Sequence, residues 1–237
     1  MNNKTKAVIL AGGMGKRFHP YSLVIPKPLI PIDEDPIILH LMNQFKKSQI
    51  TNFLISVGYR SELIKAYLSD GSQFGFQIEY FLETHPLGTV GPLSLMKDRF
   101  NKDEYFILIN GDIYTEVDFS DMIKQAKELN CDILTGTIQM KEKSSYGEIV
   151  SSNQKTIDYI VEKPEKEFII NAGIYVLNQR VLNFIPYNEF YTVPQLIDVY
   201  LNLKKPVHMY MIKEYWMGIE DQDKINEVVE KRFKLKN

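Results

Sequence analysis

A short apolar run at residues 7–10 leads directly into three closely spaced glycines, Gly12, Gly13 and Gly15, and this junction constrains the fold more than any other segment. Such a run is typical of a buried strand, and glycines at its end let the backbone turn sharply or approach a ligand closely. Apolar runs then alternate with longer amphipathic stretches. This alternation favours an open α/β sheet with a largely parallel core, in which ligands bind at the carboxyl ends of the strands.

Hydrophobic periodicity places the individual elements. In the first half we expect strands at 7–10, 53–57, 78–82 and 105–109, and helices at 35–48, 61–68 and 91–100. In the second half we expect helices at 118–129, 192–203 and 221–233, strands at 132–139, 174–177 and 207–212, and a hairpin of 148–152 with 156–162. We find no linker, internal repeat or low-complexity tract, and therefore interpret residues 1–237 as one domain.

Composition restricts the partners of the chain. The net charge is −2 and the sequence pI is about 6.1, so there is no basic footprint for nucleic acid, and any binding of phosphate must be local. The only cysteine, Cys131, excludes an internal disulfide and fits a reducing compartment. Because neither a signal peptide nor a membrane span is evident, we expect a cytoplasmic protein without membrane contact.

The residues after the glycines favour binding of a polyphosphate. Glycines at 12, 13 and 15 would aim backbone N–H groups at phosphate oxygens, and Arg17 and Lys27 would add positive charge. A P-loop is excluded because Gly15-Lys16 is followed by Arg17 and not by Ser or Thr, and a dinucleotide fingerprint is excluded because position 18 is Phe. For the glycines alone, a plain turn with solvated cations remains an alternative.

Longer motifs in the sequence resemble the signature of a known protein family. The string L-A-G-G-x-G-x-R, a gap of eight residues and then P-K-P-L-x-P resemble the signature of the sugar-phosphate nucleotidyltransferases. This family includes the mannose-1-phosphate and heptose-1-phosphate guanylyltransferases, which the chain resembles most, and glucose-1-phosphate thymidylyl- and uridylyltransferases. Further matches follow in family order: Gly58-Tyr59, the Glu83 to Gly91 loop, Asn110-Gly111-Asp112, Tyr146-Gly147, Glu162-Lys163-Pro164 and Asn171-Ala172-Gly173.

The resemblance implies a fold and a reaction. The fold is a Rossmann-like three-layer α/β sandwich with a mixed, mainly parallel central sheet, in which roughly residues 5–118 bind the nucleotide and 119–237 the sugar phosphate. In the reaction, a sugar 1-phosphate attacks the α-phosphorus of an NTP, giving an NDP-sugar for surface glycan synthesis and pyrophosphate, usually with Mg²⁺ as cofactor.

Site residues are carried over from the resemblance by position. The catalytic set is Arg17, Lys27 and Asp112, of which Asp112 would bind Mg²⁺. The nucleotide-binding set is Leu10, Ala11, Gly12, Gly13, Gly15 and Gly88. The sugar-phosphate-binding set is Gly147, Glu162, Lys163 and Asn171, with Lys163 on the phosphate and Glu162 on sugar hydroxyls.

One motif departs from the family pattern. The family places a second metal-binding aspartate in a W-x-D-x-G string near the C-terminus, and here Gly218 stands at that position after Trp216. Either Glu220 or Asp221 replaces the carboxylate, or the metal relies on Asp112, phosphates and water, or catalysis is impaired. We include Glu220 as the candidate second ligand.

Several functional alternatives stay open from sequence. We favour GTP because of the Pro-Leu-Gly-Thr-x-Gly loop and because we expect no C-terminal hexapeptide-repeat domain, but UTP, CTP and dTTP are not excluded. A cytidylyltransferase acting on a non-sugar phosphate such as phosphocholine is an alternative, and a nucleotide-sensing homologue without turnover is another. The sequence carries no signal for assembly, and a homodimer is one option.

Overall fold

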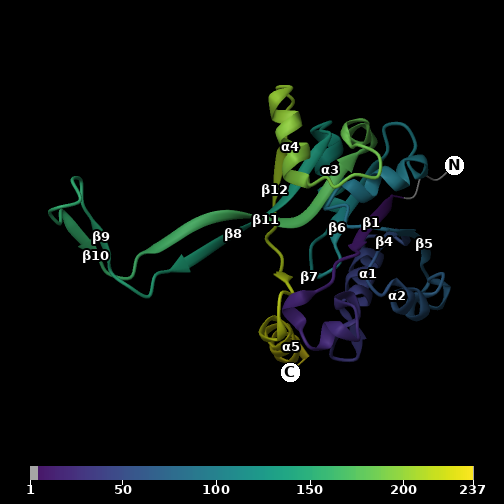
Figure 1. Ribbon diagram of the computed structural model, residues 1–237, viewed down its shortest axis with the longest axis horizontal. Coiled ribbons are helices and arrows are strands. Elements are labelled where there is room, and N and C mark those ends of the chain that lie inside the picture. The colour runs from purple at the N-terminus through teal and green to yellow at the C-terminus, as the bar shows by residue number, and fades with distance from the viewer. Residues whose placement is uncertain (1–4, 237) are drawn as a thin grey trace.

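The computed structural model describes residues 5–236 and has a seven-stranded sheet at its centre (Figure 1). The strand order is β12-β8-β11-β6-β1-β4-β5. The strands are β1 (Lys6–Ala11), β4 (Asn52–Val57), β5 (Gln77–Leu82), β6 (Tyr105–Asn110), β8 (Ile133–Lys143), β11 (Glu165–Asn178) and β12 (His208–Met211). Only β11 runs antiparallel to its neighbours, β6 and β8, so the predicted mixed, mainly parallel sheet is confirmed.

Helices cover both faces of this sheet. The α-helices are α1 (Ile37–Lys47), α2 (Ser61–Leu68), α3 (Phe119–Glu128), α4 (Val193–Asn202) and α5 (Gln222–Lys236). The segment 91–100, predicted as a helix, is a 3-10 helix, η5 (Gly91–Arg99). Further 3-10 turns are η1 (Lys16–Phe18), η2 (Tyr21–Leu23), η3 (Lys27–Leu29), η4 (Ser72–Phe74) and η6 (Gln179–Phe184).

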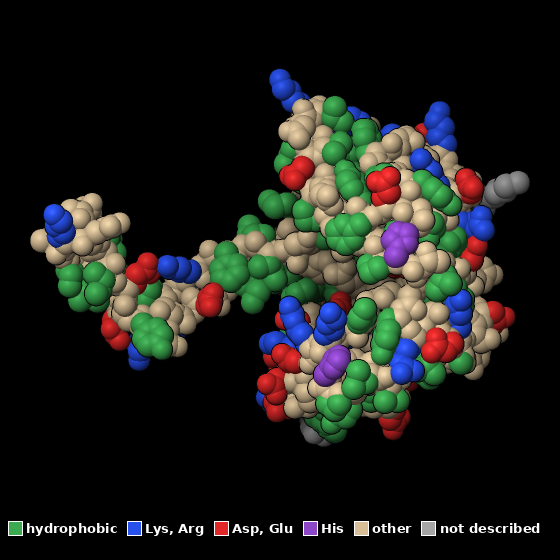
Figure 2. Space-filling model, in the orientation of Figure 1, with side chains coloured by type: hydrophobic (Ala, Val, Ile, Leu, Met, Phe, Trp, Pro, Cys, Tyr) green, Lys and Arg blue, Asp and Glu red, His purple; other side chains and the backbone are tan. Residues whose placement is uncertain are grey.

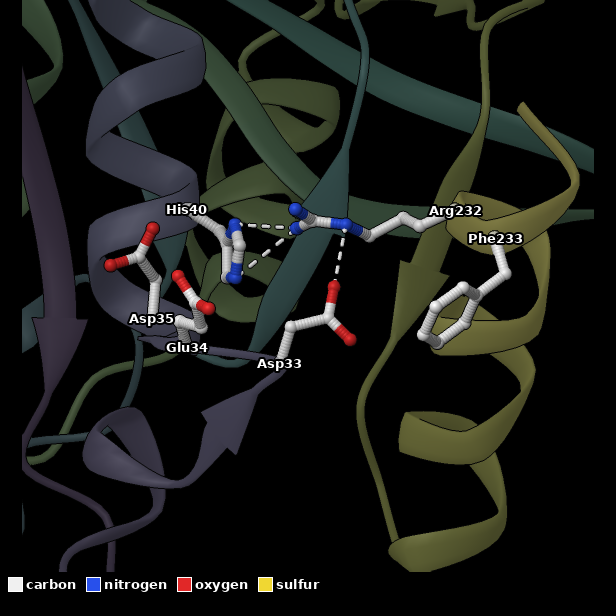
Figure 3. A pocket seen from close by; sticks show the side chains of 6 residues that line it. All are labelled: Asp33, Glu34, Asp35, His40, Arg232 and Phe233. Carbon is white, nitrogen blue, oxygen red and sulfur yellow. Dashed lines mark hydrogen bonds and ion pairs between the residues drawn. The ribbon is translucent and has the colours of Figure 1, made fainter. Parts of the chain in front are cut away.

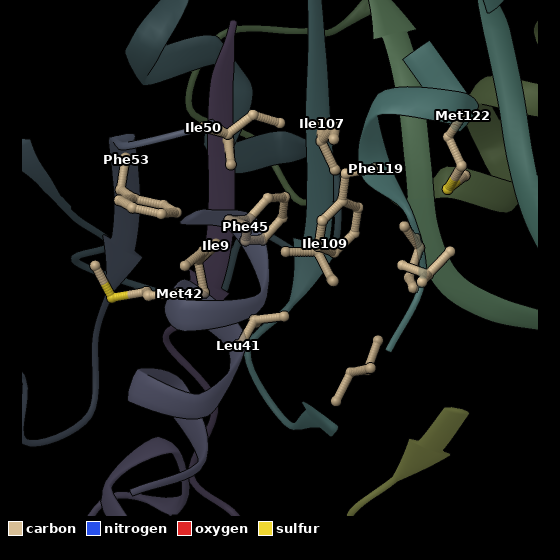
Figure 4. Packing of buried hydrophobic residues seen from close by; sticks show 14 of the residues in the cluster. Ile9, Leu41, Met42, Phe45, Ile50, Phe53, Ile107, Ile109, Phe119 and Met122 are labelled. Atoms are coloured by element: carbon tan, nitrogen blue, oxygen red, sulfur yellow. The ribbon is translucent and has the colours of Figure 1, made fainter. Parts of the chain in front are cut away.

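The core follows the alternation of side chains along the strands. From β1, Ile9 packs with α1, α2 and α3 on one face, and Figure 4 shows the part of this layer from α1 and α3. Val8 packs with η5, η6 and α4 on the other face. Within the first layer, Phe45 of α1 and Phe119 of α3 stack with their ring centroids 3.8 Å apart. The arrangement is therefore the expected three-layer sandwich.

Small sheets complete the fold. They are β2 (Pro31–Ile32) with β3 (Asp35–Pro36), β7 (Ile113–Thr115) with β13 (Trp216–Gly218), and β9 (Glu148–Val150) with β10 (Tyr159–Val161). The last pair is the predicted hairpin. No helix within the described residues has the length and apolar character needed to cross a membrane.

An arm projects from the body of the molecule. It comprises residues 139–169, which are the outer parts of β8 and β11 and the β9–β10 hairpin at their end (Figure 1). One strand was predicted to end at residue 139 and the next to begin at residue 174. In the structure the first strand continues to Lys143, and the second begins at Glu165. The extension carries no buried face, so the sequence lacked the periodicity that reveals a strand.

The C-terminal helix α5 packs against the segment that follows the glycines. Phe18, Ile32 and Ile219 form one buried cluster with Ile225 of α5. Beside it, Arg232 of α5 pairs with Asp33 at 3.0 Å and donates to His40 Nδ1 of α1 at 2.9 Å (Figure 3). His40 Nε2 lies 2.8 Å from the carbonyl oxygen of Ile32, so this nitrogen carries the proton, and the ring is neutral.

This network predicts a loss of stability in mild acid. Burial, with Arg232 nearby, lowers the pKa of His40 below its usual 6.5, against opposing effects of the Ile32 carbonyl, Asp33 and Asp35. Above pH 6.5 both the folded and the unfolded chain hold a neutral ring. Below it the unfolded chain binds a proton that the folded chain resists, so the free energy of unfolding falls as the pH drops from about 6.5 towards the lower folded-state pKa.

We therefore expect His40→Gln, which keeps a donor for Ile32 but cannot titrate, to lose less stability between pH 8 and pH 5.5 than the wild type. Denaturant melts at both pH values measure this difference. The same substitution at the exposed His19 is the control and should follow the wild type. Equal pH dependence in all three proteins would contradict the interpretation.

Candidate functional site

The carboxyl ends of β1, β4 and β6 meet at one edge of the sheet. The amide of Gly111, just after β6, donates to the carbonyl of Leu10 at 2.9 Å, and the amide of Tyr59, just after β4, donates to Gly12 at 3.3 Å. From β1 the chain proceeds to β4 and β5 on one side and later returns to β6 on the other. This reversal of strand order is where open α/β sheets bind ligands.

The glycine loop after β1 presents free backbone donors. Within the described part of the chain, the N–H groups of residues 13–16 have no hydrogen-bond acceptor. Gly15 has φ +61°, and a Cβ there would lie 2.9 Å from Cβ of Lys27, so a side chain at this position would be both strained and crowded. Successive unpaired amides next to glycine form the kind of concavity that binds anions.

Lys27 and Asp112 form an ion pair at the centre of this edge. Lys27 Nζ lies 2.6 Å from Asp112 Oδ2, and the two side chains are 14% and 38% exposed. Buried prolines, Pro26 and Pro28, flank Lys27 in the tight turn η3. The Lys27 ammonium also lies 5.5 Å from the centroid of the Phe18 ring. The cation predicted to bind phosphate and the acid predicted to bind metal are therefore adjacent.

Arg17 and Glu220 form a second, more exposed pair beside the first. Arg17 Nη1 lies 2.5 Å from Glu220 Oε2, and the side chains are 71% and 62% exposed. An exposed ion pair of this kind contributes less than about 1 kcal/mol to the stability of the fold, so Arg17 can leave Glu220 for another anion at little cost in free energy. Glu220, the candidate second metal ligand, is thus occupied by a cation.

Gly218 lies beside Asp112, as the W-x-D spacing implies. β13 pairs with β7 so that Gly218 faces Ile113, and the amide of Ile219 donates to the carbonyl of Asp112 at 2.8 Å. Within residues 5–234, whose side chains are described, no three His, Cys, Asp or Glu side chains gather as a metal site. Mg²⁺ commonly takes one or two carboxylates and completes its shell with phosphate and water, so Asp112 alone fits it.

Glu83 also lies at this strand edge, although it is not among the residues predicted from sequence. Its carboxylate accepts hydrogen bonds from Ser56 Oγ at 2.7 Å and from the amide of Leu87 at 3.1 Å. A Cβ on Gly12 would lie only 2.6 Å from Glu83 Oε1, so the carboxylate touches the glycine loop. The signal was present in the string Glu83-x-x-x-Leu87-Gly88, where an acid precedes the loop assigned to the base.

Gly88 packs closely against Tyr191 in the segment before α4. It has φ +78°, and a Cβ there would lie 2.6 Å from the carbonyl oxygen of Tyr191. That carbonyl accepts from the amides of Val90 and Gly91. Position 88 therefore requires glycine because this loop is closely packed. Contact between Gly88 and a nucleotide base stays a prediction. Leu10 and Ala11 lie within β1, and Ala11 is buried.

The four predicted sugar-phosphate residues do not all lie here. Asn171 sits at the base of the arm, where it donates to the hydroxyl of Tyr175 at 2.6 Å, and burial raises the pKa of that phenol. Gly147, Glu162 and Lys163 lie where the β8–β11 ribbon joins the β9–β10 hairpin, and a Cβ on Gly147 would be 3.1 Å from Glu162 Oε2. The structure thus groups these three, but away from Lys27 and Asp112.

Two cavities lie elsewhere on the molecule. Their volumes are about 310 Å³ and 300 Å³, and both are lined by His40 and Arg232 between α1 and α5. Neither is lined by Arg17, Lys27 or Asp112. Because the chemistry-bearing groups converge at the open strand edge, we take that edge as the candidate site.

Comparison with known proteins gives the family of the chain. A family model described as "Nucleotidyl transferase" matches residues 6–232. A mannose-1-phosphate guanyltransferase of Schizosaccharomyces pombe is 33% identical over 221 residues, covering 90% of this chain and 60% of that protein. A probable mannose-1-phosphate guanylyltransferase of Oryza sativa is 37% identical over 188 residues, covering 76% of this chain and 52% of that protein. The chain therefore spans about 60% or less of the length of these curated relatives.

Solved structures show the same fold. HddC from Yersinia pseudotuberculosis superposes with a TM-score of 0.75 at 26% identity, covering 96% of this chain and 99% of that one. The same protein complexed with GMP-PN gives a TM-score of 0.73 at 25% identity, again covering 96% and 99% of the two chains. With its sheet edge, glycine loop and matching family model, this chain belongs to the nucleotidyl transferase family.

Proposed function

We propose that this chain transfers a nucleoside monophosphate from an NTP, with GTP favoured, to a sugar 1-phosphate. The observation that carries the proposal is the convergence of the free amides of residues 13–16 with Arg17, Lys27 and Asp112 at one strand edge. The names of the guanyltransferase relatives and the GMP-PN complex of HddC support guanine nucleotide and sugar phosphate as substrates.

The reaction needs positioning more than proton transfer. An oxygen of the sugar phosphate forms a bond to the α-phosphorus, the bond from that phosphorus to the bridging oxygen breaks, and pyrophosphate leaves with the electron pair. The attacking oxygen is already anionic, so no general base is required. The contribution of the protein is in-line alignment and neutralisation of charge.

Each cation then has a defined task. Lys27, held in place by its prolines, binds phosphate oxygens near Asp112. Arg17 leaves its exposed pair with Glu220 and binds the departing phosphates through its guanidinium fork. Asp112 would hold Mg²⁺, which supplies further charge neutralisation when bound. The glycine-loop amides bind the triphosphate without any side chain.

The contacts of Glu83 give a further reason to favour GTP. Guanine places two donors, N1–H and its exocyclic amino group, side by side, and a carboxylate has only acceptors. Each Glu83 oxygen accepts one hydrogen bond from the protein, which leaves lone pairs for further donors. We place the base beside Glu83 and the Gly88 loop.

The wider assignments complete this proposal. Residues 5–118 would form the nucleotide half and 119–237 the sugar-phosphate half, in a cytoplasmic enzyme that supplies an NDP-sugar for surface glycans. Reduced, buried Cys131 is compatible with that compartment.

The first test is Asp112→Asn. Because the substitution removes the carboxylate proposed to hold Mg²⁺, we expect turnover to fall by about 10²–10³-fold. Pyrophosphate release, measured with four NTPs and several sugar 1-phosphates, provides the readout. Asp98→Asn, at an exposed position, is the control. Turnover of Asp112→Asn near that of the wild type would remove Asp112 from the site.

The second test is Glu83→Gln. The amide adds donors where guanine also presents donors, so we expect kcat/KM for GTP to fall by about 10–100-fold, while that for the other NTPs changes less. Competition among the four NTPs measures the preference. An unchanged order of preference would place the base away from Glu83.

The third test asks whether position 218 can regain a carboxylate. The φ of Gly218 is not positive, and a Cβ there would meet its nearest atom, in the Trp216 ring, at 3.5 Å, so a side chain fits. We expect Gly218→Asp to lower the Mg²⁺ concentration for half-maximal rate by roughly tenfold, because it adds a charged ligand. Gly218→Ala is the control for backbone effects, and equal Mg²⁺ curves for the two variants would contradict the prediction.

A further inference from the structure

The arm holds part of the proposed site far from the rest. From Thr137↔Asn171 to Lys143↔Glu165, β8 and β11 are paired at seven successive positions. At about 3.3 Å per residue this ladder places Glu165 roughly 20 Å from Asn171, and Lys163 lies beyond it. The ribbon leads away from the body (Figure 1). Phosphoryl transfer requires reacting atoms about 3–3.5 Å apart, so Lys163 in this position cannot hold an acceptor at the Lys27 site of its own chain.

Lys163 is nevertheless arranged as a binding group. Its backbone has φ +46°, an uncommon conformation for a residue other than glycine. Within the described residues neither Lys163 nor Glu162 has an ion-pair partner. By contrast, Lys141 of the same arm pairs with Glu167 at 2.5 Å, and Lys166 pairs with Glu148 at 3.0 Å. A strained, unpaired cation at the end of an ordered ribbon is suited to meet an anion supplied from outside.

The arm also exposes several apolar side chains to water. Met140 and Phe168 are opposite each other on one face of the ladder, and both are exposed. In the hairpin, Ile149 and Ile160 are also paired, and each is 58% exposed. Figure 2 shows hydrophobic side chains at several places along the arm. An isolated two-stranded ribbon is marginally stable in water, and contiguous exposed apolar surface marks an interface.

A second exposed apolar surface lies in the proposed nucleotide-binding half of the same chain. Between Arg17 and Lys27 the side chains of Tyr21, Leu23, Val24 and Ile25 are all exposed, and Val24 is 66% exposed. We call these four residues the collar. The arm and the collar are both exposed: the arm carries the proposed sugar-phosphate residues, and the collar lies in the sequence between Arg17 and Lys27. Within one chain the ribbon leads the end of the arm away from the body (Figure 1).

We propose that the arm docks on the collar of a second copy of this chain and brings Glu162 and Lys163 to that copy's Lys27 and Asp112. Two copies related by a two-fold axis would each donate and accept an arm, which is a closed, isologous exchange. Each complete site would then contain the nucleotide half of one chain and the sugar-phosphate half of the other. This inference rests on the proposed function, because Lys163 is assigned there to the sugar phosphate.

Complementation between two inactive variants tests the exchange. Asp112→Asn destroys the nucleotide half and Lys163→Ala the arm half, and each variant alone should have at most a few per cent of wild-type pyrophosphate release. When the two variants are co-expressed at equal levels, about half of the dimers contain one copy of each variant. Each mixed dimer has one intact shared site out of two, so about a quarter of wild-type activity should return. Activity no greater than the sum of the two variants would overturn the proposal and place both halves in one chain, with the arm folded back over its own site.

Sedimentation keeps this test separate from the proposed function. We expect the wild type to be a dimer, Phe168→Glu with Ile160→Glu to be a monomer, and Leu203→Glu, at an exposed position after α4, to remain a dimer as the control. A monomeric wild type would overturn the exchange even if the enzyme is active. Conversely, a wild-type dimer that needs the arm but shows no pyrophosphate release with any substrate pair would uphold the arm contact and contradict the proposed function.

Discussion

The ion pair of Lys27 with Asp112 is the contact on which the arrangement of the site depends. It joins two segments 85 residues apart, the turn after the glycine loop and the loop after β6, at the point where the strand order reverses. Lys27 is mostly buried, so without Asp112 its charge would lack compensation. The position of Lys27 in turn requires glycine at 15, and α5 supports the same segment through the cluster that contains Phe18 and Ile225.

Much of the fold could be predicted because its strands and helices bury one face or both. The helix at 61–68 and the four parallel strands of the first half appear where periodicity placed them, within a residue or two at each end. The segment 91–100 is a helix as predicted, but its 3-10 type could not be predicted, since apolar periodicity does not distinguish a 3-10 helix from an α-helix over nine residues. The sheet of β7 with β13 was missed because each strand has three residues and its partner lies about 100 residues away.

The site was predictable where a local motif carries the chemistry. Arg17, Lys27 and Asp112 lie together because the glycine loop and the loop after β6 end neighbouring strands. Glu83 was missed because its importance appears only in its contacts with Ser56 and the glycine loop. The placement of Lys163 on a projecting arm could not be read from sequence, because the direction of a ribbon depends on tertiary and quaternary contacts that no local pattern encodes.

The central claim is that the loop after β1, together with Lys27, binds a triphosphate. Calorimetric titration of the protein with a non-hydrolysable GTP analogue and Mg²⁺ tests this claim most directly, with Lys27→Met compared against Lys47→Met at the exposed end of α1. We predict that Kd rises at least about tenfold in Lys27→Met, because a charge-assisted hydrogen bond to phosphate is lost, and that it stays unchanged in Lys47→Met. Equal affinity in all three proteins, or no binding by the wild type at millimolar analogue, would contradict the account.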